Sequence, residues 1–248
     1  MKHLQQSVKQ VCALLLAMPL LIASSIAQGN DFPTAAPEDV GVSSERLQRL
    51  SNTMQRYIDS NMLAGTVSLV SRNGKVIHVE SQGWKNKEND EPMTDDSIFV
   101  IMSMTKPIVS TALMMLYEEG NFLLTDPITD WIPELEGKQV VIEENGINYR
   151  MSAHRPITFR HVLSHTAGVD PSREVLSEEE LTLLPRKATL EETIINRAPL
   201  PLSFHPGDDW QYGSSTDYVA LLVERISGQS LVDYLQEKIL DPLKMHDT

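Results

Sequence analysis

Cysteine is almost absent from this chain of 248 residues, because Cys12 is the only one. A single thiol cannot form an intramolecular disulfide, so a disulfide-stapled scaffold is excluded. Positive charge is also scarce: 21 Lys and Arg stand against 34 Asp and Glu, which gives a formal net charge of −13. Surfaces that bind nucleic acid or anionic lipid need a basic patch. We therefore expect no nucleic-acid partner.

Motifs of several enzyme classes are lacking as well. The chain has no Gly-x-Ser-x-Gly elbow, no P-loop and no Gly-x-Gly-x-x-Gly fingerprint. His161 and His165 lie four residues apart on a predicted helix over about 158–166, a spacing that can bind zinc. However, Val162 follows His161 where zincins carry glutamate, and no third ligand is evident. We interpret the two histidines as structural and expect neither a metal nor a cofactor.

The N-terminus has the pattern of a secretory signal peptide. A basic start is followed by the apolar run Val11–Ile22, and Ser25 and Ala27 are the small residues before a predicted cleavage site. The apolar run is too short to span a bilayer comfortably. We predict that residues 1–27 are removed, together with Cys12. The protein is then periplasmic or secreted, without a stable membrane anchor or a cysteine nucleophile.

A helix and a hairpin are predicted in the first part of the mature chain. Apolar residues recur at helical spacing in a segment of about 43–60, which is typical of an amphipathic helix. The β-rich runs Thr66–Val70 and Val76–Val79 flank Asn73 and Gly74. Asn-Gly between two such runs indicates a hairpin, because both central residues of the turn need positive φ.

The sequence after residue 98 predicts mostly helices and loops. The apolar run Ile108–Tyr117 predicts a buried helix that ends near Gly120. A second hairpin is expected for 140–143 and 147–151. Further helices are expected at about 215–227 and 230–240, which are separated by Gly228, with Ser230 as the N-cap of the second.

Ser103 and Lys106 form a Ser-x-x-Lys pair at a predicted helix start. Residues three apart on a helix share a face, so the ammonium can lie beside the hydroxyl and stabilise its alkoxide. Pro107 would clash with the carbonyl of Ser103 inside a helix, so the helix must begin near Ser103. The alternative is an ordinary helix cap with an exposed lysine.

Tyr212 is a second candidate, within Tyr212-Gly213-Ser214. Close to Lys106, its phenol would have a lowered pKa and could serve as general base and then acid. Read locally, it is a packed aromatic residue beside a turn, with its hydroxyl in water. The same choice holds for Trp210, which either lines an acyl pocket or packs against the turn.

Several segments in register resemble the beta-lactamase-like serine hydrolases, above all class C beta-lactamases and penicillin-binding-protein-like carboxylesterases and transesterases. The resemblance runs from about residue 40 to the end and is carried by Phe99–Ile108, Leu116–Gly120, Asp126–Ile128, Thr158–Gly168, Phe204–Gly207, Trp210–Ser214 and Asp241–Thr248.

This resemblance implies a fold and its parts. The fold is α/β plus all-α, with an antiparallel sheet flanked by helices and a separate helical domain. Residues 28–98 would supply the N-terminal helix and hairpin of the α/β part. Residues 99–248 would supply the nucleophile helix and the helical domain.

The resemblance also implies roles for individual residues. Ser103 would be the nucleophile, with its N–H as one oxyanion donor, and Lys106 would support its activation. Tyr212 would be the base that also protonates the leaving group. Ser214 and Trp210 would contact the substrate, a small ester or amide.

Two departures from the family pattern bear on function. Ser214 stands where beta-lactamases usually carry Asn, and the esterase branch often has Ser there, which favours esters. The family's third motif, a Gly-containing strand, is not evident between Tyr212 and Thr248. We therefore expect a C-terminally truncated chain that exposes an unpaired sheet edge and is unstable or weakly active.

The sequence thus favours an exported carboxylesterase that forms an acyl-enzyme on Ser103. A beta-lactamase or D-Ala-D-Ala-type peptidase is the alternative within the enzyme class. A non-catalytic binding protein or inactive fragment is the alternative from another class. The oligomeric state stays open.

Overall fold

The computed structural model describes residues 32–184 and 188–248, so the predicted signal peptide lies outside the described residues. The chain divides into two compact units, Met1–Phe99 and Val100–Thr248, and each is described by itself. Within the described ranges, no helix has the length and apolar character needed to cross a membrane.

The first unit contains the predicted helix and hairpin, and both are confirmed. Helix α2 (Ser44–Asp59) begins where the Ser43 side chain accepts a hydrogen bond from the N–H of Arg46 at 3.3 Å. Strands β1 (Gly65–Arg72), β2 (Lys75–Asn86) and β3 (Glu91–Pro92) form an antiparallel sheet in the order β1-β2-β3. The turn residues Asn73 and Gly74 have φ of 53° and 71°, as the turn requires.

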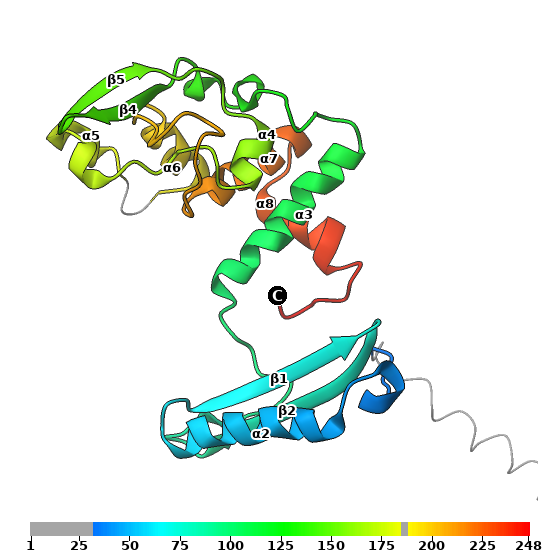
Figure 1. Cartoon of the computed structure of the whole chain (residues 1–248). Coiled ribbons are helices and arrows are strands. Elements are labelled where there is room, and N and C mark those ends of the chain that lie inside the picture. Colours follow the sequence, from blue (N-terminus) through cyan, green and yellow to red (C-terminus); the bar gives the residue numbers. More distant parts are fainter. Residues whose placement is uncertain (1–31, 185–187) are drawn as a thin grey trace, which may run out of the picture. The chain divides into compact units, whose positions relative to one another are not determined.

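Helix α2 packs against the β1–β2 hairpin, as Figure 1 shows. Ile58 of α2 and Ile77 of β2 are buried. The buried hydroxyl of Ser51 donates to Glu80, and Gln82 donates to the carbonyl of Ser51 at 3.3 Å, so polar contacts also join the helix to β2. A short 3₁₀ helix, η2 (Pro37–Val40), precedes α2.

The core of the second unit is built around two long helices. Helix α3 (Thr105–Glu118) packs against α7 (Ser215–Ser227) and α8 (Leu231–Leu235), which continues as a π-helical turn, η7 (Gln236–Leu240) (Figure 1). Side chains of α3 and α7 are buried almost completely, among them Ala112, Leu113, Leu221 and Leu222. The predicted buried helix and the helices separated by Gly228 are therefore confirmed.

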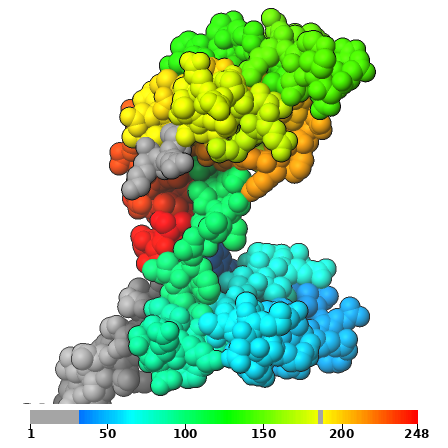
Figure 2. Space-filling model, turned by 90° about the vertical axis from the view of Figure 1, so that its left-hand side faces the viewer, coloured from blue at the N-terminus to red at the C-terminus, as the bar shows by residue number. Residues whose placement is uncertain are grey.

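The second predicted hairpin is also confirmed, as β4 (Gln139–Glu144) and β5 (Ile147–Ser152). The N–H of Val141 donates to the carbonyl of Leu202 at 2.9 Å, which ties β4 to the segment after α6 (Leu190–Arg197). Arg150 of β5 pairs with Glu180 of α5 (Glu178–Thr182) at 2.8 Å. In Figure 2 the green surface of the hairpin adjoins the yellow surface of the segment that carries α5 and α6.

Within the described ranges, three 3₁₀ helices of the second unit follow α3. They are η4 (Ile128–Asp130), η5 (Pro133–Leu135) and η6 (Arg173–Val175).

Helix α4 (Phe159–Leu163) is shorter than the predicted helix over 158–166. His165 has φ of 58°, a left-handed conformation that a helix does not continue through, so the two histidines do not share a helix face. His161 Nδ1 accepts a hydrogen bond from the N–H of Thr158 at 3.1 Å, a structural role at the helix start. Among the described residues, no group of three or more potential ligands could hold a metal ion.

Candidate active site

Ser103 lies in the 3₁₀ turn η3 (Met102–Met104), directly before α3. The ammonium of Lys106, in the first turn of α3, donates to Ser103 Oγ at 3.2 Å. Met102 has φ of 48°, which is uncommon for a residue with a side chain and costs on the order of 1 kcal/mol. The sequence therefore places a strained turn directly beside the hydroxyl, with a cation next to it.

Tyr212 reaches the same hydroxyl from the segment that precedes α7. Its phenol donates to Ser103 Oγ at 2.8 Å, and Lys106 Nζ lies 4.9 Å from the centre of its ring. Ser103 lowers the pKa of Tyr212 as a hydrogen-bond partner of its phenolate form, and the adjacent Lys106 ammonium lowers that pKa further. The structure thus brings together the three residues predicted to be catalytic, although Tyr212 itself is half exposed.

This cluster has the parts that nucleophilic catalysis needs. A hydroxyl becomes a good nucleophile only when a neighbouring group takes its proton. Lowering the pKa of a phenol increases the fraction that is ionised at a given pH, and the Lys106 cation favours both the phenolate and a developing alkoxide.

His165, which the sequence predicts to be only structural, lies beside this cluster. Its ring centre lies 4.9 Å from that of Tyr212, and its Nδ1 accepts a long hydrogen bond of 3.4 Å from the N–H of Gly213. Its carbonyl accepts from the N–H of Gln211 at 3.0 Å. Burial lowers the pKa of His165, and the charge of Lys106 lowers it further. A neutral imidazole therefore supports the segment that carries Tyr212.

Ser214 is held by two charged residues that sequence reasoning did not single out. Its Oγ donates to Asp170 Oδ1 at 2.6 Å and its N–H donates to Oδ2 at 2.7 Å. Arg197 donates to the same Oγ at 2.9 Å and pairs with Asp170 at 3.3 Å. The hydroxyl proton of Ser214 is thus used within the protein, and its predicted contact with substrate stays a prediction.

Trp210 is 61% exposed, and its ring centre lies 6.4 Å from that of Tyr212. It lines a pocket of about 410 Å³ with Val141, Phe204 and Gln211. Trp210 is thus a neighbour of Tyr212, which in turn contacts Ser103. Its predicted role as a substrate-contacting wall agrees with this placement and stays a prediction.

The Beta-lactamase family profile matches residues 50–248 of this chain. The chain belongs to the Beta-lactamase family. The family resemblance and the beta-lactamase/transpeptidase-like fold, both expected from the sequence, are therefore confirmed.

Relatives of this Beta-lactamase family chain include esterases. Esterase EstB of Burkholderia gladioli is 30% identical over 207 residues, which cover 80% of this chain and 50% of EstB. The structure of EstCE1, a hydrolase with promiscuous acyltransferase activity, matches with a TM-score of 0.67 at 27% identity and covers 80% of this chain and 51% of EstCE1. The chain spans about half the length of these relatives.

A second solved structure shares the fold. Simvastatin synthase (LovD) from Aspergillus terreus matches with a TM-score of 0.64 at 24% identity, covering 82% of this chain and 52% of LovD.

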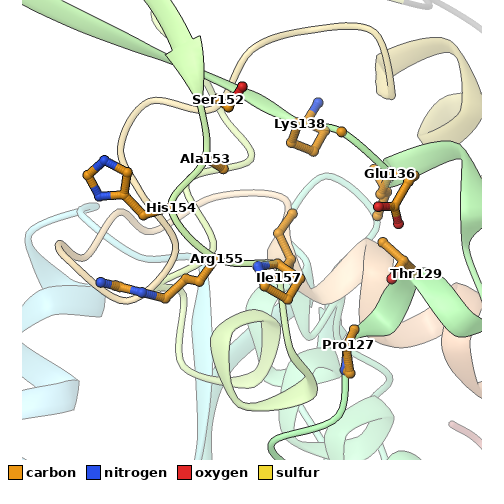
Figure 3. A pocket seen from close by; sticks show the side chains of 12 residues that line it. Pro127, Thr129, Glu136, Lys138, Ser152, Ala153, His154, Arg155 and Ile157 are labelled. Carbon is orange, nitrogen blue, oxygen red and sulfur yellow. The ribbon is translucent and has the colours of Figure 1, made fainter.

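A second pocket of the Beta-lactamase family chain has a volume of about 400 Å³ (Figure 3). Lys138, Arg155 and Ile157 are among the residues that line it, and none of the three predicted catalytic residues does. Lys138 Nζ donates to the carbonyl of Ala198 at 2.7 Å and to that of Leu200. Burial lowers the pKa of Lys138 to about 8. These bonds connect the segment before β4 with the end of α6.

Proposed function

We propose that this protein is an exported carboxylesterase that forms an acyl-enzyme on Ser103. The observation that carries the proposal is the convergence of Lys106 Nζ and the Tyr212 hydroxyl on Ser103 Oγ, at 3.2 and 2.8 Å. Membership of the Beta-lactamase family supports hydrolase chemistry, and the similarity to an esterase supports an ester substrate. Export rests on the signal-peptide pattern of residues 1–27.

Acylation begins with proton transfer from Ser103 to the Tyr212 phenolate. The serine oxygen then forms a bond to the ester carbonyl carbon, and the carbonyl oxygen takes the negative charge of a tetrahedral intermediate. When that intermediate collapses, the bond to the alcohol oxygen breaks and Tyr212 donates its proton to the leaving alkoxide. Lys106 stabilises the anionic forms of both side chains.

Deacylation repeats these steps with water. Tyr212, now a phenolate again, takes a proton from a water molecule whose oxygen attacks the acyl carbon. Collapse releases the carboxylic acid, and the proton held by Tyr212 returns to Ser103 Oγ. Atoms and charges balance, and the enzyme is regenerated.

Labelling and turnover of Ser103 variants test the proposal. A fluorophosphonate probe should label the wild-type protein at Ser103, and Ser103→Ala should lose both the label and the hydrolysis of p-nitrophenyl butyrate. Ser60→Ala, an exposed serine in the first unit, is the matched control and should behave as wild type. Full ester turnover by Ser103→Ala would refute the assignment.

Two further assays separate the alternatives. Hydrolysis of a chromogenic cephalosporin at a rate above that of the ester would indicate a beta-lactamase. Stable labelling of Ser103 without turnover of either substrate would indicate a non-catalytic protein. For export, the secreted protein should begin at Gln28, which N-terminal sequencing can show.

A further inference from the structure

The carboxylate of Asp170 contacts two consecutive residues directly after Tyr212. It accepts hydrogen bonds of 2.7 Å from the N–H and 2.6 Å from the Oγ of Ser214. Hydrogen bonds to an ionised carboxylate are about twice as strong as those between neutral groups. The backbone is therefore held firmly at the point where the Tyr212 segment enters α7.

Gly213 also lies against the carboxylate of Asp170. A Cβ added at this glycine would lie 2.8 Å from Asp170 Cγ, which is closer than carbon atoms pack, and still nearer to Oδ2. The carboxylate thus occupies the space that a side chain at position 213 would need. Gly213 has no positive φ, so alanine is excluded there by this contact and not by its backbone conformation.

The charge of Asp170 is balanced within the protein. Asp170 and Arg197 pair at 3.3 Å, with side chains that are 24% and 26% exposed. Arg197 also donates to Ser214 Oγ at 2.9 Å. Burial raises the pKa of the nearby Asp217, and the charges of Arg197, Asp170 and Lys106 also affect it. The ion pair is therefore mostly shielded from solvent and contacts the residue at the start of α7.

We propose that Asp170 is a positioning residue that holds Tyr212 within hydrogen-bond distance of Ser103, for the ester hydrolysis proposed above. It acts through Gly213 and Ser214 and does not touch the reacting atoms. Arg197, which pairs with it at 3.3 Å, helps to orient its carboxylate. A displacement of about 1 Å at a reacting group can cost about a hundredfold in rate. Loss of the contacts of Asp170 with Gly213 and Ser214 should therefore lower kcat.

The pKa of Tyr212 distinguishes positioning from a simple charge effect. Its phenol is flanked by Ser103 and Lys106, with His165 against its ring. The charged and titratable groups near Asp170 are Arg197, Asp217, His165 and the buried Tyr218. Removing a nearby anion would lower the pKa of a phenol through charge alone. Loss of position separates Tyr212 from Ser103 and Lys106 and therefore raises it. The two explanations predict opposite signs.

The first experiment follows Tyr212 in wild type and Asp170→Asn by NMR with ring-labelled tyrosine, assigned with Tyr212→Phe. We expect the Tyr212 pKa to rise in Asp170→Asn, and kcat for p-nitrophenyl butyrate to fall about tenfold to a hundredfold with little change in KM. Ser214→Ala removes the 2.6 Å bond to Asp170 and the 2.9 Å bond from Arg197. It keeps the 2.7 Å bond from the backbone N–H to Asp170, so it should give a smaller rise. It serves as the test variant if Asp170→Asn does not fold.

A double-mutant cycle provides the second test. Gly213→Ala should displace the carboxylate and lower kcat about tenfold or more. The added methyl group would lie 3.4 Å from Asp170 Cβ, an ordinary contact, so Asp170→Ala leaves room for it. The double variant Asp170→Ala/Gly213→Ala should therefore be no slower than Asp170→Ala alone.

Three results would overturn the inference: wild-type kcat in a folded Asp170→Asn, a Tyr212 pKa that stays or falls, or multiplicative effects in the cycle. A different result would show that the proposed esterase function is wrong. In that case the wild type neither hydrolyses esters nor reacts with the probe, while the titration of Tyr212 still decides the role of Asp170.

Discussion

The hydroxyl of Tyr212 donates a 2.8 Å hydrogen bond to the Oγ of Ser103 across 109 residues of chain. Each residue stands just before a long helix, Ser103 before α3 and Tyr212 before α7. Because α3 packs on α7, the two starting points meet. The site is therefore a product of tertiary packing within the unit Val100–Thr248, and neither motif alone could have formed it.

Tyr212→Phe should lower kcat for ester hydrolysis by about 10²- to 10⁴-fold, the usual contribution of a general base. The ring and its contact with His165 remain, so the melting temperature should stay close to that of wild type. Steady-state kinetics and a thermal melt measure both. Tyr57→Phe in α2 is the matched control and should leave kcat unchanged. A Tyr212→Phe enzyme with wild-type kcat would exclude Tyr212 as the base.

Lys106→Met should move the acidic limb of the pH–rate profile to higher pH. In the native protein, the hydrogen bond to Ser103 and then the Lys106 ammonium lower the pKa of Tyr212. Without the cation that pKa rises, so the phenolate forms only at higher pH and activity near neutral pH is lost. The measurement is kcat/KM against pH. Lys87→Met in the first unit is the control, and an unmoved limb in Lys106→Met would contradict the prediction.

Stability should rise with pH between about 8 and 10.5, in part because of Lys138. Burial lowers the pKa of its ammonium from 10.5 to about 8 in the folded protein. Between these values the unfolded chain binds more protons than the folded one, so the free energy of unfolding increases with pH, by about 3 kcal/mol at most. Below pH 8 this cost of burying the ammonium is fully present.

Urea unfolding of wild type and Lys138→Met at several pH values isolates this contribution. The stability of wild type relative to Lys138→Met should increase from pH 8 to 10.5, because the methionine does not titrate. Lys238→Met, at an exposed ion pair with Glu237, should show no such increase relative to wild type. A constant difference between wild type and Lys138→Met would mean that Lys138 is solvated in solution.

Gly168→Ala should destabilise the fold by more than Gly228→Ala. Both glycines have positive φ, 72° and 70°, so alanine is strained by about 1–2 kcal/mol at either position. At Gly168 the added Cβ would also lie 2.7 Å from the carbonyl oxygen of Phe204, whereas at Gly228 it meets nothing within 4 Å. Urea unfolding of the two variants measures the difference, and equal losses would show that the backbone at Phe204 can move.

Local sequence patterns predicted most of the fold's elements because those elements are determined locally. Asn73-Gly74 and Asn145-Gly146 specify their hairpins through positive φ. Gly228 and Ser230 specify the end of one helix and the start of the next.

The one helix predicted too long, over 158–166, ends early because of a tertiary effect. The helix stops after Leu163, and the chain turns at His165, whose carbonyl binds Gln211 and whose ring meets Tyr212. The partners of His165 lie more than forty residues away, so no local pattern contained this turn.

The sequence predicted those residues of the candidate site that lie within family motifs. Ser103, Lys106 and Tyr212 lie within recognisable segments, and the structure brings them together. Asp170 and Arg197 carry no motif of their own. They matter only because packing places them against Ser214, and an isolated Asp or Arg in a sequence does not reveal such a contact.

The packing of α3 on α7 determines the distance between Ser103 and Tyr212. A slip of one helix by a single turn along the other would move Ser103 about 5.4 Å from Tyr212, while leaving both helices intact. Buried residues of this contact, such as Leu113 and Leu222, therefore set the alignment of Ser103 and Tyr212 as well as stability. Substitutions deep in this core can therefore separate Ser103 from Tyr212 while the chain stays folded.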